Sequence, residues 1–491
     1  MEISELSDAE RRVWDAYPLG RSVDFREHDR EPADAGAEWG PERAVRAEVL
    51  RALLLDGPRQ AGETPVLRVS GARVTGRLDL QYADVAAPIH LWACRFDEEL
   101  DVYGAQLRQL SLGRSVLPGL HGVALRIDGS LRMTGCRVRG PVRLGGARIS
   151  GGLFLEGARL GEEGALPLSE PILGLNRATV DDNLRADGGF TAHGMVRLAG
   201  AVVAGTITLN DAVLNNPGDT ALHATNLSGG TDLHAMRLTA RGRINLRGAR
   251  IPGQLNFAYA RLSNPGGMAL RASSLVVGEL WLREAAHIEG TVTLRRSQLD
   301  LLHITPETWP GAVRLDGLTY TTLDPHEPAE RRLQILERDA DGYVPYAYEQ
   351  LATAYRRIGD DAAARKVQLA KQRRHRTTLA WYAKAWGYLQ DATVGYGFRP
   401  TRAAVWLLSL LLIGSVAYAV REPAALKPDE APEFNPVFYT LDLLLPIIDF
   451  GQESAYAARG AFQWFGYALV IMGWTLATTI AAGITRAISR Q

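Results

Sequence analysis

An eleven-residue motif recurs between about residue 68 and residue 320 and constrains the fold of this 491-residue chain more than any other feature. Its pattern is G-A-x-[VI]-x-G-x-[LIV]-x-[LF]-x, in which apolar residues come in pairs two apart. A helix would need apolar spacings of three and four, whereas two-residue alternations broken by glycine are typical of very short strands joined by tight corners. The clearest copies are 71–81, 135–145, 146–156, 200–210 and 248–258.

Two motifs make one coil of about 22 residues with four short sides. Because the period is fixed, we expect each coil to bury its apolar residues against the next one, as in a solenoid. About ten coils at ~4.8 Å each would form a rod on the order of 50 Å long. The pattern resembles the right-handed quadrilateral parallel β-helix of pentapeptide-repeat proteins, although it departs from their A-[DN]-L-x-x repeat.

A slower period overlies the motif. Pro/Gly-rich segments at 117–123, 215–220 and 264–268 are each followed by a similar apolar tetrapeptide, and a fourth such tetrapeptide begins at Ile172. This spacing predicts a loop that leaves the same corner in every second coil.

Six arginines occupy outward positions of the motif and form a candidate docking stripe for an acidic partner. The alternative is an ordinary solvated charged face. The six residues are Arg126, Arg132, Arg137, Arg139, Arg143 and Arg148.

The ends of the repeat block predict helices. Residues 1–66 read as a helical cap, with Ser7 capping a first helix and a second helix in 39–57 that starts at Pro41. Its apolar face would contain Val45, Val49 and Leu53. After the β-helix at 67–322, residues 323–400 read as a helical hairpin and juxtamembrane linker, within which 348–376 resembles one tetratricopeptide unit.

Residues 401–491 predict a membrane domain. Residues 403–420 and 460–484 are uncharged and long enough to cross a bilayer. The connection at 421–462 holds three basic residues against seven acidic ones, so the positive-inside rule places both chain termini in the cytoplasm of a cell-membrane protein. The amino terminus has no apolar stretch of the signal-peptide kind.

Two segments resemble parts of potassium channels. The sequence TVGYG at 393–397 matches a selectivity filter, but it precedes the first predicted span. We expect it to end a helix and form a turn before the chain enters the membrane. Residues 434–453 lie between the spans, where a two-helix channel has its pore loop; the alternative is an interfacial helix on the outer leaflet. The candidate pore-loop residues are Thr440, Asp442, Pro446, Asp449, Phe450 and Gly451.

Motifs of enzyme chemistry do not appear in the sequence. It has no dinucleotide fingerprint, phosphate-binding loop, nucleophile elbow or zinc-ligand spacing, so we expect no catalytic residue, no cofactor and no metal. Cys94 and Cys136 fall at the small inward position of the motif and are expected to be core residues.

The segments EFNPVFYTLDLLLPIIDFGQE at 433–453 and DATVGYGFRPTRAAVWLL at 391–408, together with the repeats, resemble a group of actinobacterial proteins labelled membrane-associated oxidoreductases. The resemblance extends over the whole chain and implies a membrane location and a redox activity.

We expect a non-catalytic scaffold or sensor that is anchored in the lipid bilayer and binds a protein partner at the cytoplasmic membrane face. The alternatives are a homo-oligomeric two-helix ion channel and the oxidoreductase that the resemblance implies. Acidic and basic residues balance at 55 each, which gives no reason to expect nucleic acid as a partner.

Overall fold

A computed structural model describes residues 5–28, 33–164, 170–394, 400–427, 431–445 and 449–488. The chain divides into two compact units, Met1–Ala354 and Tyr355–Gln491. The predicted boundaries after residues 66, 322 and 400 are finer than this division and stay predictions.

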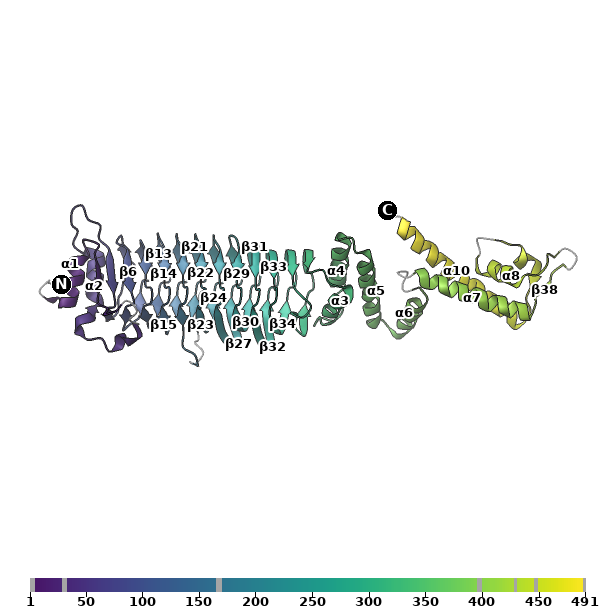
Figure 1. Ribbon diagram of the computed structural model, residues 1–491, viewed down its shortest axis with the longest axis horizontal. Helices are drawn as coiled ribbons and strands as arrows, with labels where there is room; N and C mark the ends of the chain where they lie inside the picture. Colours follow the sequence, from purple (N-terminus) through teal and green to yellow (C-terminus); the bar gives the residue numbers. More distant parts are fainter. Residues whose placement is uncertain are drawn as a thin grey trace. The chain divides into compact units, whose positions relative to one another are not determined.

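Most of the first unit is a parallel β-solenoid of about 12 turns, which confirms that the repeat forms a parallel solenoid and adds two turns to the predicted number (Figure 1). Each regular coil contributes four strands, two to each of two large parallel sheets. In one coil these are β13 (Arg126–Ile127), β14 (Leu131–Arg132), β15 (Arg137–Val138) and β16 (Val142–Arg143).

The longest ladder of hydrogen-bonded strands runs from the first strand of the chain to the last strand of the solenoid. Its members are β1 (Ser22–Asp24), β3 (Leu67–Ser70), β6 (Ile89–Trp92), β10 (Leu110–Ser111), β14, β18 (Leu153–Phe154), β22 (Leu184–Arg185), β26 (Ile207–Thr208), β29 (Leu233–His234), β31 (Arg250–Asn256), β33 (Val276–Trp281), β35 (Gln298–His303) and β37 (Thr319–Asp324).

Aliphatic side chains fill the interior of the coils. Ile127 pairs with Ile149 and Leu131 with Leu153, one coil further along, and all four are buried. These inward positions therefore stack on aliphatic residues of the next coil, which removes apolar surface from water. The strands inside each ladder are paired on both edges.

Glycine in the motif has a geometric reason. Gly146 and Gly157 lie at corners with φ of +65°, in the left-handed region that glycine adopts without strain. The alanine that follows each of them points inward and is fully buried, because the corner leaves room for a small side chain only.

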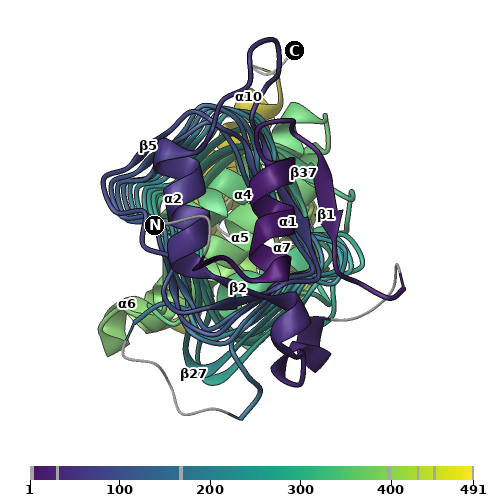
Figure 2. The ribbon, with the colours of Figure 1, turned by 90° about the vertical axis from the view of Figure 1, so that its left-hand side faces the viewer.

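Two helices cover the amino-terminal end of the solenoid, α1 (Asp8–Ala16) and α2 (Ala47–Asp56) (Figures 1 and 2). Ser7 caps α1 as predicted and forms a capping box with Glu10. The helices hide an apolar end that would otherwise be open to water.

The helix predicted to start at Pro41 starts at Ala47, so that prediction is wrong at its beginning. Pro41–Arg43 form a 3-10 turn, and β2 (Ala44–Arg46) follows and pairs with β4 (Arg73–Thr75). Val45 is buried as expected but lies in this strand. Pairing with the edge of the first coil outweighs the local helical spacing.

The predicted long corners are confirmed at two places and wrong at a third. The pairing of β27 (Val213–His223) with β30 (Thr239–Asn245) breaks between Asn215 and Thr220, and that of β32 (Arg261–Arg271) breaks between Ser263 and Met268. At 117–123 only two residues separate β11 (Val116–Leu117) from β12 (Leu120–His121), so no loop is inserted.

Two helices follow the last coil, α3 (Ala329–Glu337) and α4 (Pro345–Arg357), and α4 ends three residues beyond Ala354, the last residue of the first unit. Arg332 of α3 donates hydrogen bonds to the carbonyl oxygens of Ile304 and Pro325, both at 2.7 Å, which ties α3 to the end of the solenoid.

The second unit is helical. Its helices are α5 (Asp361–Thr377), α6 (Trp381–Val394), α7 (Pro400–Val420), α8 (Pro436–Leu444), α9 (Gln452–Ala455) and α10 (Ala461–Ile488). The two helices predicted in 348–376 are α4 and α5, separated at Gly359. The TVGYG segment ends α6 with Thr393 and Val394, and its glycines lie outside the described residues.

Candidate functional site

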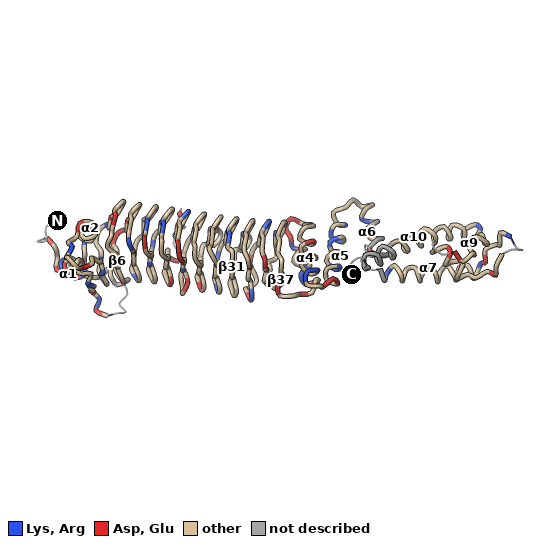
Figure 3. Tube along the Cα trace, turned by 90° about the horizontal axis from the view of Figure 1, so that it is seen from above, with Lys and Arg blue, Asp and Glu red and all other residues tan. Residues whose placement is uncertain are grey.

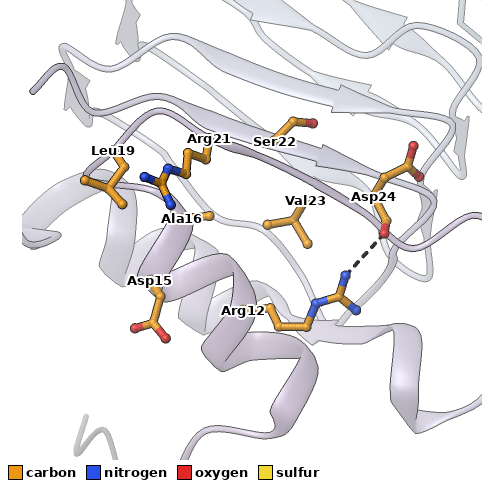
Figure 4. Close-up of a pocket in the computed structure, with 8 residues that line it drawn as sticks. All are labelled: Arg12, Asp15, Ala16, Leu19, Arg21, Ser22, Val23 and Asp24. Carbon is orange, nitrogen blue, oxygen red and sulfur yellow. Dashed lines mark hydrogen bonds between the residues drawn. The ribbon is translucent and has the colours of Figure 1, made fainter.

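A hollow at the amino-terminal end has a volume of about 410 Å³ and lies between α1 and β1 (Figure 4). Arg12 crosses it and donates to the carbonyl oxygen of Asp24 at 3.3 Å, while its guanidinium lies 4.7 Å from the Phe25 ring. The Arg12 guanidinium is therefore engaged within the protein.

The six arginines of the predicted docking stripe lie on different sides of the coil and do not form one surface. Only Arg126 and Arg148 are register partners, on β13 and β17 (Arg148–Ile149). The others have contacts of their own: Arg132 with the Phe154 ring, Arg137 with Asp34, Arg139 with Glu162, and Arg143 with Glu99 and Glu170. Outward residues close in sequence separate because the chain turns a corner every five or six residues.

Arginine recurs along the solenoid (blue in Figure 3), and the register of one strand ladder shows where arginines align. Its strands are β8 (Leu100–Asp101), β12, β16, β20 (Leu173–Gly174), β24 (Val196–Arg197), β27, β30, β32, β34 (Glu289–Thr293) and β36 (Ala312–Arg314). The last residues of these strands stack in the order Asp101, His121, Arg143, Gly174, Arg197, His223, Asn245, Arg271, Thr293 and Arg314.

The amino-terminal part of this ladder is internally neutralised. Asp101 is fully buried and accepts hydrogen bonds from Arg77, from Gln81 and from the backbone N–H of Tyr103, while His121 Nδ1 lies 3.3 Å from its carboxylate. Burial alone would raise the pKa of Asp101, but these hydrogen bonds outweigh it and hold the pKa below its usual value. Asp101 is therefore a structural carboxylate.

Arg143 is also neutralised. Its guanidinium lies 2.7 Å from Glu99 and 2.5 Å from Glu170. Gly174, the next position of the ladder, has no side chain and separates this neutral part from the residues that follow.

Beyond Gly174 the ladder contains basic residues at Arg197, His223, Arg271 and Arg314, and Arg243 lies two residues before the Asn245 position. Among the described residues, Arg197 and Arg271 have no carboxylate within salt-bridge distance, and Arg243 reaches Asp219 only at 3.9 Å. The Nε atoms of Arg197 and Arg243 are buried and make no hydrogen bond within the described part of the chain. Burial, with the charges of Arg197 and Arg243, lowers the pKa of His223, so this histidine is neutral at pH 7. We call Arg197, His223, Arg243 and Arg271 the arginine face.

The sequence prediction missed the arginine face because its members lie 20 or more residues apart. The signal that identifies them is the coil period itself: writing the chain in rows of one coil places Arg197, His223 and Arg271 in one column.

In the second unit, α7 contains one stretch, Arg402–Val420, that is long and apolar enough to cross a membrane. Large apolar side chains are exposed along α7 and along the described part of α10. They include Val405, Leu408, Leu412, Val416, Trp464 and Ile471.

Helix α8 packs closely on both long helices. A Cβ built on Gly473 of α10 would lie 2.4 Å from the carbonyl oxygen of Leu444. Thr440 is fully buried and donates to the carbonyl oxygen of Pro436 at 2.7 Å. Tyr439, Leu443 and Leu444 of α8 form one apolar core with Tyr418 of α7 and Leu469 of α10.

The candidate pore-loop residues divide into a buried and an exposed group. Asp442 is buried and accepts backbone hydrogen bonds from Phe450 at 2.7 Å, Gln452 at 2.8 Å and Glu453 at 3.2 Å, so it holds the loop after α8 in place. Asp449 and Phe450 are exposed, and Gly451 has φ of +78°. Pro446 lies outside the described residues.

Cys94 and Cys136 are fully buried, which confirms the predicted core positions. They stack with Ala72, Ser115 and Ala158 as the small inward residue of successive coils. Burial raises the pKa of each thiol to about 12, so both stay protonated at neutral pH. Within the described residues no three His, Cys, Asp or Glu side chains are grouped to hold a metal ion.

Comparison of the chain with protein-family models, curated proteins and solved structures finds no match. The resemblance to the actinobacterial group therefore stays a sequence-based prediction.

Proposed function

We propose that this protein is a membrane-anchored scaffold whose arginine face binds an acidic segment of a partner protein. The observation that carries the proposal is the change along one ladder from a neutralised part, ending at Arg143, to Arg197 and Arg271, which have no carboxylate partner in the part of the chain that the structure describes. We take the solenoid to be a right-handed quadrilateral β-helix of the pentapeptide-like kind.

The geometry favours a partner that presents carboxylates. A rigid ladder repeats its side chains every ~4.8 Å, so the guanidinium groups are positioned before the partner arrives. Guanidinium groups form charge-assisted, often bidentate hydrogen bonds with carboxylates. Arg197 and Arg243 are partly exposed although their Nε atoms are buried, so a partner would contact the outer part of each side chain.

Support for membrane anchoring comes from the apolar stretch of α7 and from the exposed apolar side chains of α7 and α10. In this proposal α7 and α10 both cross the cell membrane, and the acidic connection between them lies outside. The solenoid and both chain ends then lie in the cytoplasm.

A second candidate function is an oligomeric channel, and the packing of α8 favours it. Gly414 and Gly473 let α8 approach the middle of both long helices, and this packing supports a re-entrant helix over a helix lying on the outer leaflet. In a channel, the exposed Asp449 would be the carboxylate available to line a pore, since Asp442 is occupied by backbone amides.

The test of the scaffold uses the full chain purified in detergent and a labelled polyglutamate peptide. The double change Arg197→Glu with Arg271→Glu should weaken binding at least tenfold, about 1.4 kcal/mol. The matched control, Arg126→Glu with Arg148→Glu, makes the same charge change on another side of the coil and should leave binding unchanged.

Two outcomes would overturn the proposal. Equal loss in both double variants would mean that binding follows net charge alone. Competition by a single-stranded polynucleotide as strong as that by polyglutamate would point to a general polyanion site.

A further inference from the structure

Helix α6 exposes three large aromatic side chains. The exposed fractions are 81 % for Trp381, 65 % for Tyr382 and 62 % for Tyr388. Exposed Trp and Tyr in this number are unusual for a helix surrounded by water but typical of a membrane–water interface, where their rings are both apolar and able to hydrogen-bond. Helix α6 ends at Val394, and the candidate span begins at Arg402.

Helix α5 brings positive charge to the same place. Residues 361–394 contain seven Lys or Arg and only two Asp. Four of the seven fall between Lys371 and Arg376, in the last turns of α5. Such clusters beside a membrane span are attracted to anionic headgroups.

Asp391 links the three helices. Its carboxylate lies 2.9 Å from Arg373 and 3.3 Å from Arg376 of α5, and its carbonyl oxygen accepts a hydrogen bond from Arg402 of α7 at 3.4 Å. The Arg376 guanidinium also lies 3.8 Å from the centre of the Tyr388 ring. The basic end of α5 and the aromatic residues of α6 are thus held beside the beginning of the span.

Not all of this charge is neutralised by Asp391. Arg374 and Lys384 have no ion-pair partner among the described residues, and both side chains are partly exposed. They are cations that remain available to a ligand near the beginning of the span.

We propose that α5 and α6 bind the headgroups of anionic phospholipids, with Arg374 and Lys384 contacting phosphate groups and Trp381 and Tyr382 lying at headgroup depth. This proposal requires that α7 crosses the membrane, but it is independent of the arginine face and its partner. It gives the protein a preference for membranes or membrane regions rich in acidic lipid.

The test measures lipid retention by native mass spectrometry of the full chain in detergent, incubated with equal amounts of phosphatidylglycerol and phosphatidylcholine. The wild type should retain phosphatidylglycerol preferentially. Arg374→Gln with Lys384→Gln should lower that preference on the order of tenfold, since each positive charge near a bilayer contributes severalfold to the attraction. Arg126→Gln with Arg148→Gln removes equal charge from the solenoid and should change nothing.

Hydrogen exchange of the α6 amides in nanodiscs gives a second readout. Exchange should be slower in nanodiscs containing phosphatidylglycerol than in pure phosphatidylcholine, and Trp381→Ala should reduce this difference. Added inorganic phosphate should not displace the lipid.

Equal phosphatidylglycerol retention by the wild type and the α5–α6 double variant would overturn the inference, as would displacement by free phosphate. Extraction of the chain from membranes by alkaline carbonate would instead refute the anchoring, so the two failures are distinguishable.

Discussion

Gly414 of α7 and Thr440 of α8 lie so close that a Cβ at Gly414 would come within 2.4 Å of the Thr440 methyl carbon. Thr440 is fully buried in this contact. The connection between the two long helices of the second unit therefore packs against one of them through a position that only glycine fits.

The change Gly414→Val should destabilise the second unit by about 2 kcal/mol, because overpacking a close helix contact forces the helices apart. The measurement is the temperature at which the detergent-solubilised chain loses its monodisperse peak in size-exclusion chromatography. Leu412→Val alters an exposed position of the same helix and serves as the control. Equal melting of Gly414→Val and the control would mean that α8 does not pack on α7 in this way.

Asp101→Asn should lower the free energy of unfolding of the solenoid by about 2 kcal/mol at pH 7, since Arg77 and His121 lose a buried carboxylate. The pKa of Asp101 is lowered in the folded state, so its stabilisation is fully present above the unfolded pKa of about 3.9 and is lost as pH falls through the folded pKa. The difference between wild type and variant should therefore shrink below about pH 4. Urea unfolding across pH measures it, with the exposed Asp84→Asn as control. A difference that stays constant down to pH 3 would contradict the argument.

Both thiols should be unreactive towards a thiol reagent at pH 8 in the folded chain and react fully in denaturant, because Cys94 and Cys136 are buried with a pKa of about 12. Cys136→Ser should fold, since Ser115 already occupies the equivalent position and donates to the carbonyl oxygen of Leu91 at 2.9 Å. Rapid labelling of the native protein would show that the coil opens at these positions.

The channel hypothesis predicts a cation conductance from the oligomer in a planar bilayer that falls severalfold on Asp449→Ala. Asp442→Asn should instead loosen the loop after α8, detected as faster hydrogen exchange at residues 450–453. No conductance, or conductance indifferent to Asp449, would remove this function.

The oxidoreductase implied by the sequence resemblance predicts a bound chromophore. An absorption spectrum of protein purified from its natural host membrane checks this, and flavin or haem bands would favour the enzyme over the scaffold.

The coil period made the solenoid predictable, because a repeat that places Ile127 over Ile149 and Leu131 over Leu153 has no other way to bury them. The same period also determines which outward-facing residues lie side by side on the surface. Arg126 and Arg148 are one coil apart and lie together, whereas Arg132 and Arg137 are close in sequence and lie on different sides.

The sequence alone could not predict the effect of contacts between residues that are far apart in the chain. Val45 has helical spacing to Val49 and Leu53, yet it lies in a strand because β4 offers a free edge. The roles of Asp442 and Asp449 are also indistinguishable in sequence. Only the folded loop reveals that three backbone amides donate to the buried Asp442, whereas the exposed Asp449 accepts one, from Gly451.

The long corners at 215–220 and 264–268 have a practical consequence. The strands regain their register after the extra residues, with Leu214 opposite Ala240 before the first corner and Leu222 opposite Ile244 after it. Gly218 and Gly266, at the two tips, have open space where a Cβ would be. An epitope or a small fluorophore-binding peptide spliced in at either glycine would sit at a known height, and the two heights differ by two coils, roughly 10 Å. Labels at these two positions would therefore show where along the solenoid another protein attaches.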